Sequence, residues 1–403
     1  MGPTRTARTP GKMRAARRRL SDAAAAALLA AAALPATSQP PGESPPSPDP
    51  QTPGPIVRRE PATKLLALDI ISDIPARLGG ELGEPDVTVE PVGEERLGAI
   101  RQQATGWMTE TLAPLDDPAC SFVREAFAIG SAAEIAARLS AAFPGQRALA
   151  SAPGGEPVLI PEKLPVPDDE AMEWFASTGL LPAEIALSAE WARAVAARHS
   201  GPSPRDRLLR HARAARIEGV ARLAALLVTL RRTGIEPRQL GVELLRADRD
   251  RASWDRAALL EAARTPLVGA FVRALLEDGM RWATYQYVRG GIPGLVAALE
   301  RPAVGPEDLL RPGLRRRPLA AQAGGCRLGP RPMAALLIGT DDPAWIDTVE
   351  DAVLVAGEPQ WWRGWLQLES VHAAESAAAD MLAAGCRVDL REDRLDVSCA
   401  PRR

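Results

Sequence analysis

The side chains with the clearest capacity for chemistry lie in two consecutive segments that both read as helices. Glu190 and His199 belong to the first segment, and His211 and Glu218 belong to the second. His211 and Glu218 are seven residues apart, on one side of a helix, and His199 ends the preceding helix. Two imidazoles and a carboxylate are a ligand set that zinc accepts. The alternative is that a histidine at a helix end only caps the helix or interacts with its dipole. His372 starts a helix in the C-terminal part, and we take it to be unrelated to such a site.

Two runs of the same segments form a recognisable pattern. Residues 188–199 read SAEWARAVAARH, and residues 216–221 read RIEGVA. In this order they resemble the exported bacterial zinc metallopeptidases of the gluzincin type. The core helix of that family reads A-H-E-L-T-H-A-L-Q-D-Q-H, and its next helix reads V-E-G-[DE]-A and supplies a glutamate as the third zinc ligand.

The resemblance continues beyond these two helices and covers roughly residues 85 to 400. Residues 266–291 are similar to a family segment in which a large apolar helix leads to a Tyr and a Gly-Gly. The run EDLLRP at 307–312 resembles E-Q-I-L-H-P of the family. The C-terminal part resembles its W-x-T-x-W-D-S-x-x-[DE]-A tail. The order and spacing of these runs imply the helical core of such a peptidase.

The zinc-binding chemistry of the family is missing from the matching positions. In H-E-x-x-H, two imidazoles on one helix face converge on the metal ion, and a catalytic zinc needs three protein ligands and an open position for water. Here Ala189 and Arg193 stand at the two histidine positions. Alanine has no lone pair to donate, and arginine stays protonated and repels a divalent cation. Only Glu190, at the general-base position, and Glu218, at the third-ligand position, are retained.

Arg193 suggests a substitute for the metal. Its guanidinium would occupy the vacated position and pair with Glu190 or Glu218, which converts an active site into a structural ion pair. The alternative is that Arg193 and Glu190 are solvated charges on the surface of an ordinary helix.

We therefore expect a catalytically inactive, metallopeptidase-like protein of the cell envelope that binds a peptide or protein partner and has no cofactor. Two alternatives stay open. The protein could be an active metal-dependent hydrolase with a zinc site rebuilt from His199, His211 and Glu218, or a purely structural exported domain. The formal net charge of -2 gives no overall attraction to nucleic acid, which we do not expect as a partner.

The N-terminal region indicates export. Arginines and a lysine in the first nineteen residues precede an apolar run at 23–34 and the small-residue exit Pro35-Ala36-Thr37-Ser38, as in a signal peptide. We assign 1–38 to this signal and the Pro-rich 39–58 to a disordered linker. The apolar run is shorter than the ~20 residues of a membrane span, so we expect no span after signal removal. The mature protein would be periplasmic or extracellular, or tethered to the membrane if the signal is uncleaved.

The four cysteines fit an oxidising compartment. In CRVDLREDRLDVSC, a two-residue turn at Glu392-Asp393 places Cys386 opposite Cys399 at a non-hydrogen-bonded pair, where Cα atoms lie about 4.5 Å apart. A disulfide tolerates that separation. Cys120 and Cys326 are then paired by elimination. The alternative is four buried free thiols.

The hydrophobic pattern predicts a mainly α protein of the α+β class. We expect a helical metallopeptidase-like domain at 59–300, a Pro/Arg-rich joint at 301–332, and a small α+β unit with a β-hairpin at 333–403. The helices expected in the helical domain begin with a stretch from 64 and then cover 96–112, 117–128, 131–143, 169–177, 182–199, 204–233 after an N-cap at Ser203, 255–263, 266–288 and 292–299. DVTVEPV and PVLI are expected strands, PVLI at a sheet edge, and the last unit should read helix (343–355), strand (360–369), helix (372–384) and hairpin.

Overall fold

The computed structural model describes most of the chain between residues 106 and 399 together with a few earlier residues. The described residues are 74, 82, 89–93, 95, 106–142, 150–151, 158–161, 182–232, 237, 241, 261–303, 305–313, 325–340, 342–356 and 362–399. The expected signal, the Pro-rich linker, the helix at 169–177 and nearly all of the stretch from 64 lie outside them. Within this described part, no helix is long and apolar enough to cross a membrane.

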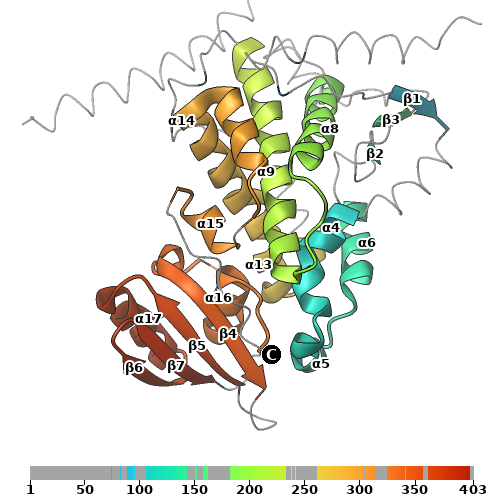
Figure 1. Cartoon of the computed structure of the whole chain (residues 1–403). Coiled ribbons are helices and arrows are strands. Elements are labelled where there is room, and N and C mark those ends of the chain that lie inside the picture. Colours follow the sequence, from blue (N-terminus) through green and yellow to red (C-terminus); the bar gives the residue numbers. More distant parts are fainter. Residues whose placement is uncertain are drawn as a thin grey trace, which may run out of the picture.

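The helical part is arranged around α9 (Arg207–Arg232), which runs through its centre with α8 and α14 packed alongside (Figure 1). The fold class is mainly α with a small C-terminal sheet, as predicted. The other described helices are α4 (Gly106–Leu112), α5 (Ser121–Phe127), α6 (Ala132–Ala142), α8 (Pro182–His199), α13 (Pro266–Arg273), α14 (Gly279–Leu299), α15 (Glu307–Leu310), α16 (Pro330–Ile338) and α17 (Val371–Ala383).

The central helix starts later than predicted, and its middle is buried on all sides. It starts at Arg207 rather than after Ser203, because the carboxylate of Asp206 accepts a hydrogen bond from the backbone N–H of Leu209 at 3.0 Å and so caps the helix. Every residue from 214 to 229 is buried, so α9 has no polar face along its middle. A helix enclosed by neighbours on all sides buries its charged residues as well, and each of these then needs a partner.

The predicted helices at 266–288 and 292–299 form one interrupted run. A π-helical turn, η4 (Ala274–Asp278), separates α13 from α14. Gly291, which has φ 64° and ψ -159°, breaks the helical geometry inside α14, two residues before Pro293. This left-handed backbone favours glycine because it has no Cβ.

The backbones of α9 and α14 cross at Gly219 and Gly279. A Cβ atom on Gly219 would lie 2.0 Å from the carbonyl oxygen of Gly279, and one on Gly279 would lie 2.1 Å from the carbonyl oxygen of Ala215. Both helices therefore need glycine at the contact. The crossing directly follows two buried acids, Glu218 and Asp278.

A small three-stranded sheet lies beside α8. Its strands are β1 (Val89–Val92), β2 (Ala150–Ser151) and β3 (Val158–Pro161), in the order β1-β3-β2. The predicted strand in PVLI is present as β3, but its expected edge position is wrong. It pairs in parallel with β1 on one side and antiparallel with β2 on the other, so both of its edges are used.

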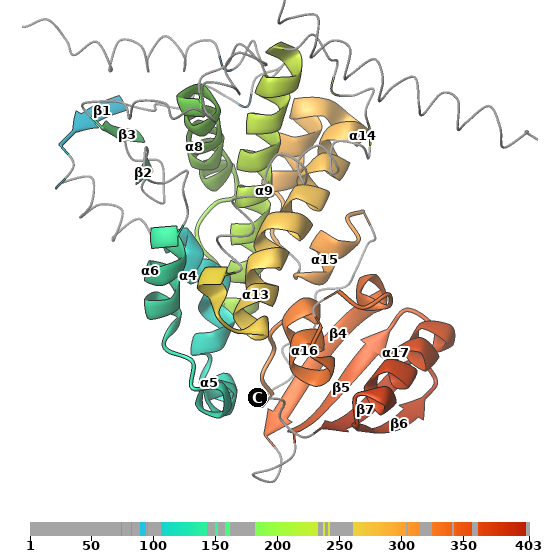
Figure 2. The ribbon, with the colours of Figure 1, turned by 180° about the vertical axis from the view of Figure 1, so that it is seen from behind.

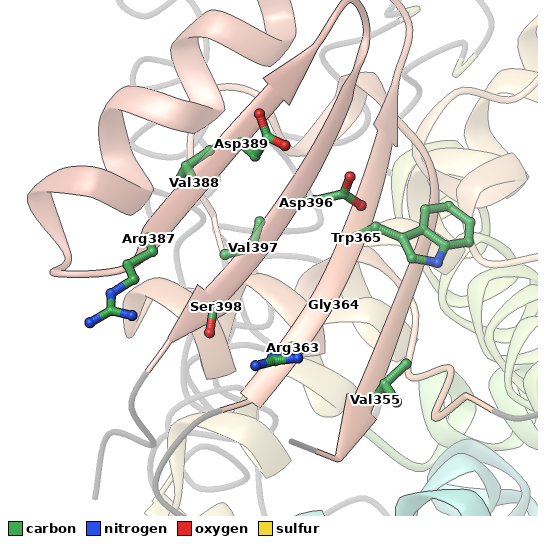
Figure 3. A pocket seen from close by; sticks show the side chains of 10 residues that line it. All are labelled: Val355, Arg363, Gly364, Trp365, Arg387, Val388, Asp389, Asp396, Val397 and Ser398. Carbon is green, nitrogen blue, oxygen red and sulfur yellow. The ribbon is translucent and has the colours of Figure 1, made fainter. Parts of the chain in front are cut away.

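The C-terminal unit is an antiparallel sheet with a helix on one face. Its order is β4-β5-β7-β6, and the strands are β4 (Val349–Ala356), β5 (Trp362–Leu368), β6 (Arg387–Arg391) and β7 (Arg394–Cys399). Figure 2 shows α17 in front of this sheet, whereas Figure 1 shows the opposite face, part of which is enlarged in Figure 3. The helix predicted at 343–355 is wrong. A short 3₁₀ turn, η5 (Ile346–Thr348), is followed by β4, because pairing with β5 along the whole strand outweighs the local preference for helix.

The hairpin has the predicted register. Arg391 lies opposite Arg394 across the turn, and Glu392 in that turn has φ 54°. Cys386 and Cys399 form a disulfide with a Cα–Cα distance of 4.3 Å, as the register requires.

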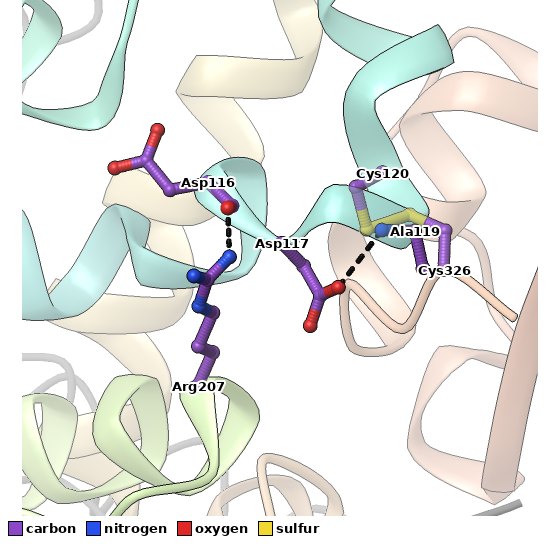
Figure 4. Close-up of a disulfide and its surroundings, with 6 residues drawn as sticks. All are labelled: Asp116, Asp117, Ala119, Cys120, Arg207 and Cys326. Atoms are coloured by element: carbon purple, nitrogen blue, oxygen red, sulfur yellow. Dashed lines mark hydrogen bonds between the residues drawn. A yellow bond between two sulfur atoms is a disulfide. The ribbon is translucent and has the colours of Figure 1, made fainter. Parts of the chain in front are cut away.

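The second predicted disulfide, Cys120–Cys326, is also present and joins residues 206 positions apart in the chain (Figure 4). Cys120 ends the 3₁₀ turn η2 (Pro118–Cys120), whose N-terminus is capped by Asp117 through Ala119 N–H at 2.9 Å. Cys326 exchanges backbone hydrogen bonds with Leu354 of β4 at 2.7 and 2.9 Å. This disulfide therefore links the helical part to the C-terminal sheet.

Arg207, at the start of α9, reaches the same neighbourhood. It donates a hydrogen bond to the carbonyl oxygen of Asp116, the last residue of the 3₁₀ turn η1 (Ala113–Asp116) (Figure 4).

The predicted joint at 301–332 contributes α15 and the start of α16 to the fold. One hydrophobic core includes residues of both the helical part and the C-terminal sheet.

The glycine crossing gives a test of the fold. We expect Gly219→Ala to lower the free energy of unfolding by about 3 kcal/mol, because the new methyl group must push two backbones apart. Urea denaturation followed by circular dichroism measures this change. Gly290→Ala in α14 is the matched control, since its Cβ would have no atom within 4 Å, and it should be neutral or slightly stabilising. Equal stability of the two variants would contradict the close crossing.

Candidate functional site

The site predicted from the sequence forms where α8 packs against α9. Glu190 and Arg193 are three residues apart on α8 and so lie on the same helix face. Glu218 lies on the face of α9 that meets them. The structure therefore brings together three of the four residues that the sequence analysis singled out by their resemblance to a zinc-binding motif.

Arg193 lies between the two carboxylates. Its Nε is 3.0 Å and its Nη2 is 2.9 Å from Oε2 of Glu218, and its Nη1 forms an ion pair with Oε1 of Glu190. The exposed fractions are 6% for Arg193, 5% for Glu190 and 1% for Glu218. The predicted pairing of Arg193 is confirmed, and the alternative of solvated surface charges is wrong. We refer to Glu190, Arg193 and Glu218 as the ion triad.

The electrostatics of the triad follow from its burial. Burial would lower the pKa of Arg193, but the carboxylates of Glu190 and Glu218 outweigh it and raise that pKa above its ordinary value. Burial raises the pKa of Glu218, while Arg193 and the nearby Arg222 oppose the rise. Arg222 is itself only 8% exposed. Two guanidiniums thus compensate two carboxylates in the interior.

Ala189, at the remaining motif position, is half-buried and offers no ligand atom. Zinc does not fit this set, because the one side chain between the carboxylates is a permanent cation with five N–H donors and no acceptor. The arrangement can hold α8 against α9 and can donate hydrogen bonds to carboxylates. It has no imidazole to bind a metal ion.

The two histidines weighed as substitute ligands have other partners. Nε2 of His199 lies 2.9 Å from the carbonyl oxygen of Leu82, and its Nδ1 lies 3.3 Å from Oε1 of Glu300. His211 is fully buried, and its Nδ1 lies 2.8 Å from the carbonyl oxygen of Thr111. Among the described residues, no group of three or more His, Cys, Asp or Glu side chains is placed to hold a metal ion. His372 lies near the start of α17, exposed, 3.8 Å from Glu375.

His211 has an apolar environment that fixes its charge state. Its ring meets the ring of Phe271 edge-on at a centroid distance of 5.4 Å. Burial lowers the pKa of His211 to about 4, against the opposing effect of its hydrogen bond to Thr111. Because the carbonyl of Thr111 can only accept, Nδ1 carries the proton in the neutral ring.

A second buried ion pair was not predicted from the sequence. Arg331 of α16 binds Asp278 of the π-helical turn through two hydrogen bonds of 2.7 and 2.8 Å, and it reaches Asp342 at 2.9 Å. Arg331 is 1% and Asp278 2% exposed. Burial raises the pKa of Asp278, and Arg331 opposes this. No local signal marks the pair, because its members are 53 residues apart and Arg331 lies in a segment that reads as a Pro/Arg-rich joint.

The first four residues of the run EDLLRP form α15, which contacts α9. Asp308 in this run accepts a hydrogen bond from Nη2 of Arg216 at 2.6 Å, and Arg216 lies two residues before Glu218 on α9. The guanidinium of Arg216 also lies 4.9 Å from the ring centroid of Trp282 in α14. Arg216 is thereby the link between three helices. The sequence pattern marked the segment but not this contact.

Comparison of the chain with protein-family models, with curated proteins and with solved structures finds no match.

The triad predicts a large effect of removing its cation. We expect Arg193→Met to lower the free energy of unfolding by about 3–5 kcal/mol, because two buried carboxylates lose their counter-charge. Urea denaturation measures the loss. Adding Glu190→Gln and Glu218→Gln to the same variant should restore much of it, since the remaining groups are neutral.

The control for this variant is Arg391→Met. Arg391 pairs with Asp389 at 2.8 Å, but both side chains are exposed, and we expect a change below about 1 kcal/mol. If Arg193→Met is as mild as Arg391→Met, the triad does not stabilise the protein.

His211 predicts a pH dependence of stability. The unfolded chain binds a proton at His211 near the ordinary pKa of 6.5, whereas the folded chain does so only near about 4. The unfolded state therefore binds more protons between these values, and the free energy of unfolding falls as the pH drops through this range, by up to about 3 kcal/mol.

Urea denaturation at several pH values, compared between the unchanged protein and His211→Asn, isolates this effect. Asparagine keeps a donor for the carbonyl of Thr111 but does not titrate. Subtracting the free energies of unfolding of the two proteins at each pH removes the contributions of Glu218 and Asp278, which both proteins share. His372→Asn is the matched control, because the side chain of His372 is 96% exposed. A parallel pH dependence in all three proteins would rule out a buried neutral His211.

Proposed function

We propose that this chain is a catalytically inactive, metallopeptidase-like protein of the cell envelope, which binds a peptide or protein partner without cleaving it. The observation that carries the proposal is the position of Arg193. Its guanidinium bridges the residue at the general-base position, Glu190, and the residue at the third-ligand position, Glu218. A cation thus stands between the same two carboxylates that would face a zinc ion.

The chemistry of a guanidinium differs from that of zinc in ways that bear on catalysis. Zinc acts as a Lewis acid and lowers the pKa of a bound water to about 7. Arg193 has no coordination position for water or for a substrate carbonyl. Its positive charge is compensated by ion pairs with two buried carboxylates. The contact between α8 and α9 would then be kept, while the ability to hydrolyse a peptide bond is lost.

The export part of the proposal has support of a different kind. Two disulfides, Cys120–Cys326 and Cys386–Cys399, are typical of proteins that fold in an oxidising compartment. The basic and apolar pattern of residues 1–38 points in the same direction.

Metal content tests the central claim. We expect the unchanged protein to be free of zinc after purification in zinc-supplemented buffer, and the double variant Ala189→His, Arg193→His to bind about one zinc per chain. Inductively coupled plasma mass spectrometry measures the metal, and circular dichroism with and without zinc shows whether the variant is folded.

Adding Glu218→Gln to the double variant is the matched control, because it removes the third ligand and should abolish tight zinc binding. Stoichiometric zinc in the unchanged protein would instead favour an active hydrolase with a rebuilt site, and His199, His211 and Glu218 would then be the ligands to change. A folded double variant that binds no zinc would contradict the resemblance on which the proposal rests.

A further inference from the structure

The sheet of the C-terminal unit has one covered and one open face. Along β7, the side chains of Leu395, Val397 and Cys399 are buried, whereas the alternating Arg394, Asp396 and Ser398 are half-buried. The buried set faces α17, which packs on β5, β6 and β7. The opposite face, towards the viewer in Figure 1, contains a hollow of about 510 Å³. This volume lies within the ~300–1,000 Å³ of small-ligand sites.

The strand register arranges the charges of this face in rows (Figure 3). Arg363 of β5 and Arg387 of β6 both lie opposite Ser398 of β7, so the three residues form one row across the strands. In the next row along the strands, Asp396 lies between Trp365 and Asp389.

The two aspartates already have cationic partners. Asp389 accepts a hydrogen bond from Arg391 at 2.8 Å, and Asp396 accepts one from Arg394 at 3.0 Å. The guanidinium of Arg394 also lies 4.7 Å from the ring centroid of Trp365. On β5, β6 and β7 this face thus carries four arginines and two aspartates, although the whole chain has a formal net charge of -2.

Arg363 is an arginine of this face whose positive charge is not compensated by either aspartate. Its side chain is exposed, and within the described part of the chain it makes no hydrogen bond or ion pair. Beside it, Val355 of β4 is 43% exposed and gives the hollow an apolar wall. A ligand that matches this face has a carboxylate for the arginine row and an apolar part for Val355 and Trp365. Arginine binds carboxylates through two parallel hydrogen bonds, which favours this chemistry over a neutral ligand.

We propose that the open face of the C-terminal sheet is a docking surface for an acidic peptide segment of a partner protein, with a carboxylate held between Arg363 and Arg387 above Ser398. A peptide supplies both the carboxylate and adjoining apolar side chains, and the hollow can hold a few residues of an extended segment. The surface is built on strands outside the helices that carry the ion triad, so this proposal does not depend on the metal content of the protein.

The experiment measures the fluorescence anisotropy of a fluorescein-labelled peptide that alternates glutamate and valine, titrated with the full chain. We expect saturable binding that weakens as salt is added and is absent for the same peptide with glutamine in place of glutamate. Arg363→Gln should weaken binding about tenfold, because one charge-assisted contact is lost. The exposed Arg205→Gln, before α9, is the matched control and should leave binding unchanged. Thermal melting shows that both variants stay folded.

Three results would overturn the proposal. Binding that is equal in Arg363→Gln and in the unchanged protein would place the peptide elsewhere. Absence of binding by the acidic peptide at millimolar protein would mean that the face is a solvated surface. Displacement of the peptide by inorganic phosphate at similar concentration would identify a general anion site rather than a peptide-docking surface.

Discussion

The burial of α9 on all sides is the constraint from which the rest of the helical part follows. A charged side chain in the middle of this helix has no access to water, and an unpaired buried charge is too unfavourable to persist. Glu218 and Arg216 therefore each have a partner on a neighbouring element. Glu218 is paired with Arg193 of α8, and Arg216 with Asp308 of α15. These contacts hold α8 beside Glu218 and α15 beside Arg216.

The close crossing of two helices explains why two acids are buried at all. Gly219 and Gly279 bring the backbones of α9 and α14 into contact, and Glu218 and Asp278 directly precede these glycines. Both carboxylates next to this crossing are almost fully buried, and burial raises the pKa of both. Arg193 of α8 and Arg331 of α16 supply the missing charge from outside the crossing pair. Two sites that look unrelated in the sequence are thus consequences of one contact.

The ion triad differs from a metal site in what it requires of its surroundings. A zinc site requires an open coordination position, so it must stay accessible to substrate. A guanidinium between two carboxylates has no such requirement, and all three side chains of the triad are buried. In contrast, the C-terminal sheet keeps a charged and partly apolar face towards solvent, and this is the face for which we propose a partner.

The sequence by itself determined the features that depend on neighbouring residues. The periodic segments gave α8 and α17, and the alternation around a two-residue turn gave the hairpin register and the Cys386–Cys399 disulfide. The resemblance to a zinc site also led to the prediction that Arg193 would pair with Glu190 or Glu218, and Glu190 lies three residues away on the same helix face. Only the tertiary structure decided that segment 349–356 is a strand, that β3 is central, and that Asp278 meets Arg331. These outcomes arise from pairing and burial between distant segments, whose energies exceed the local preferences that a sequence pattern can express.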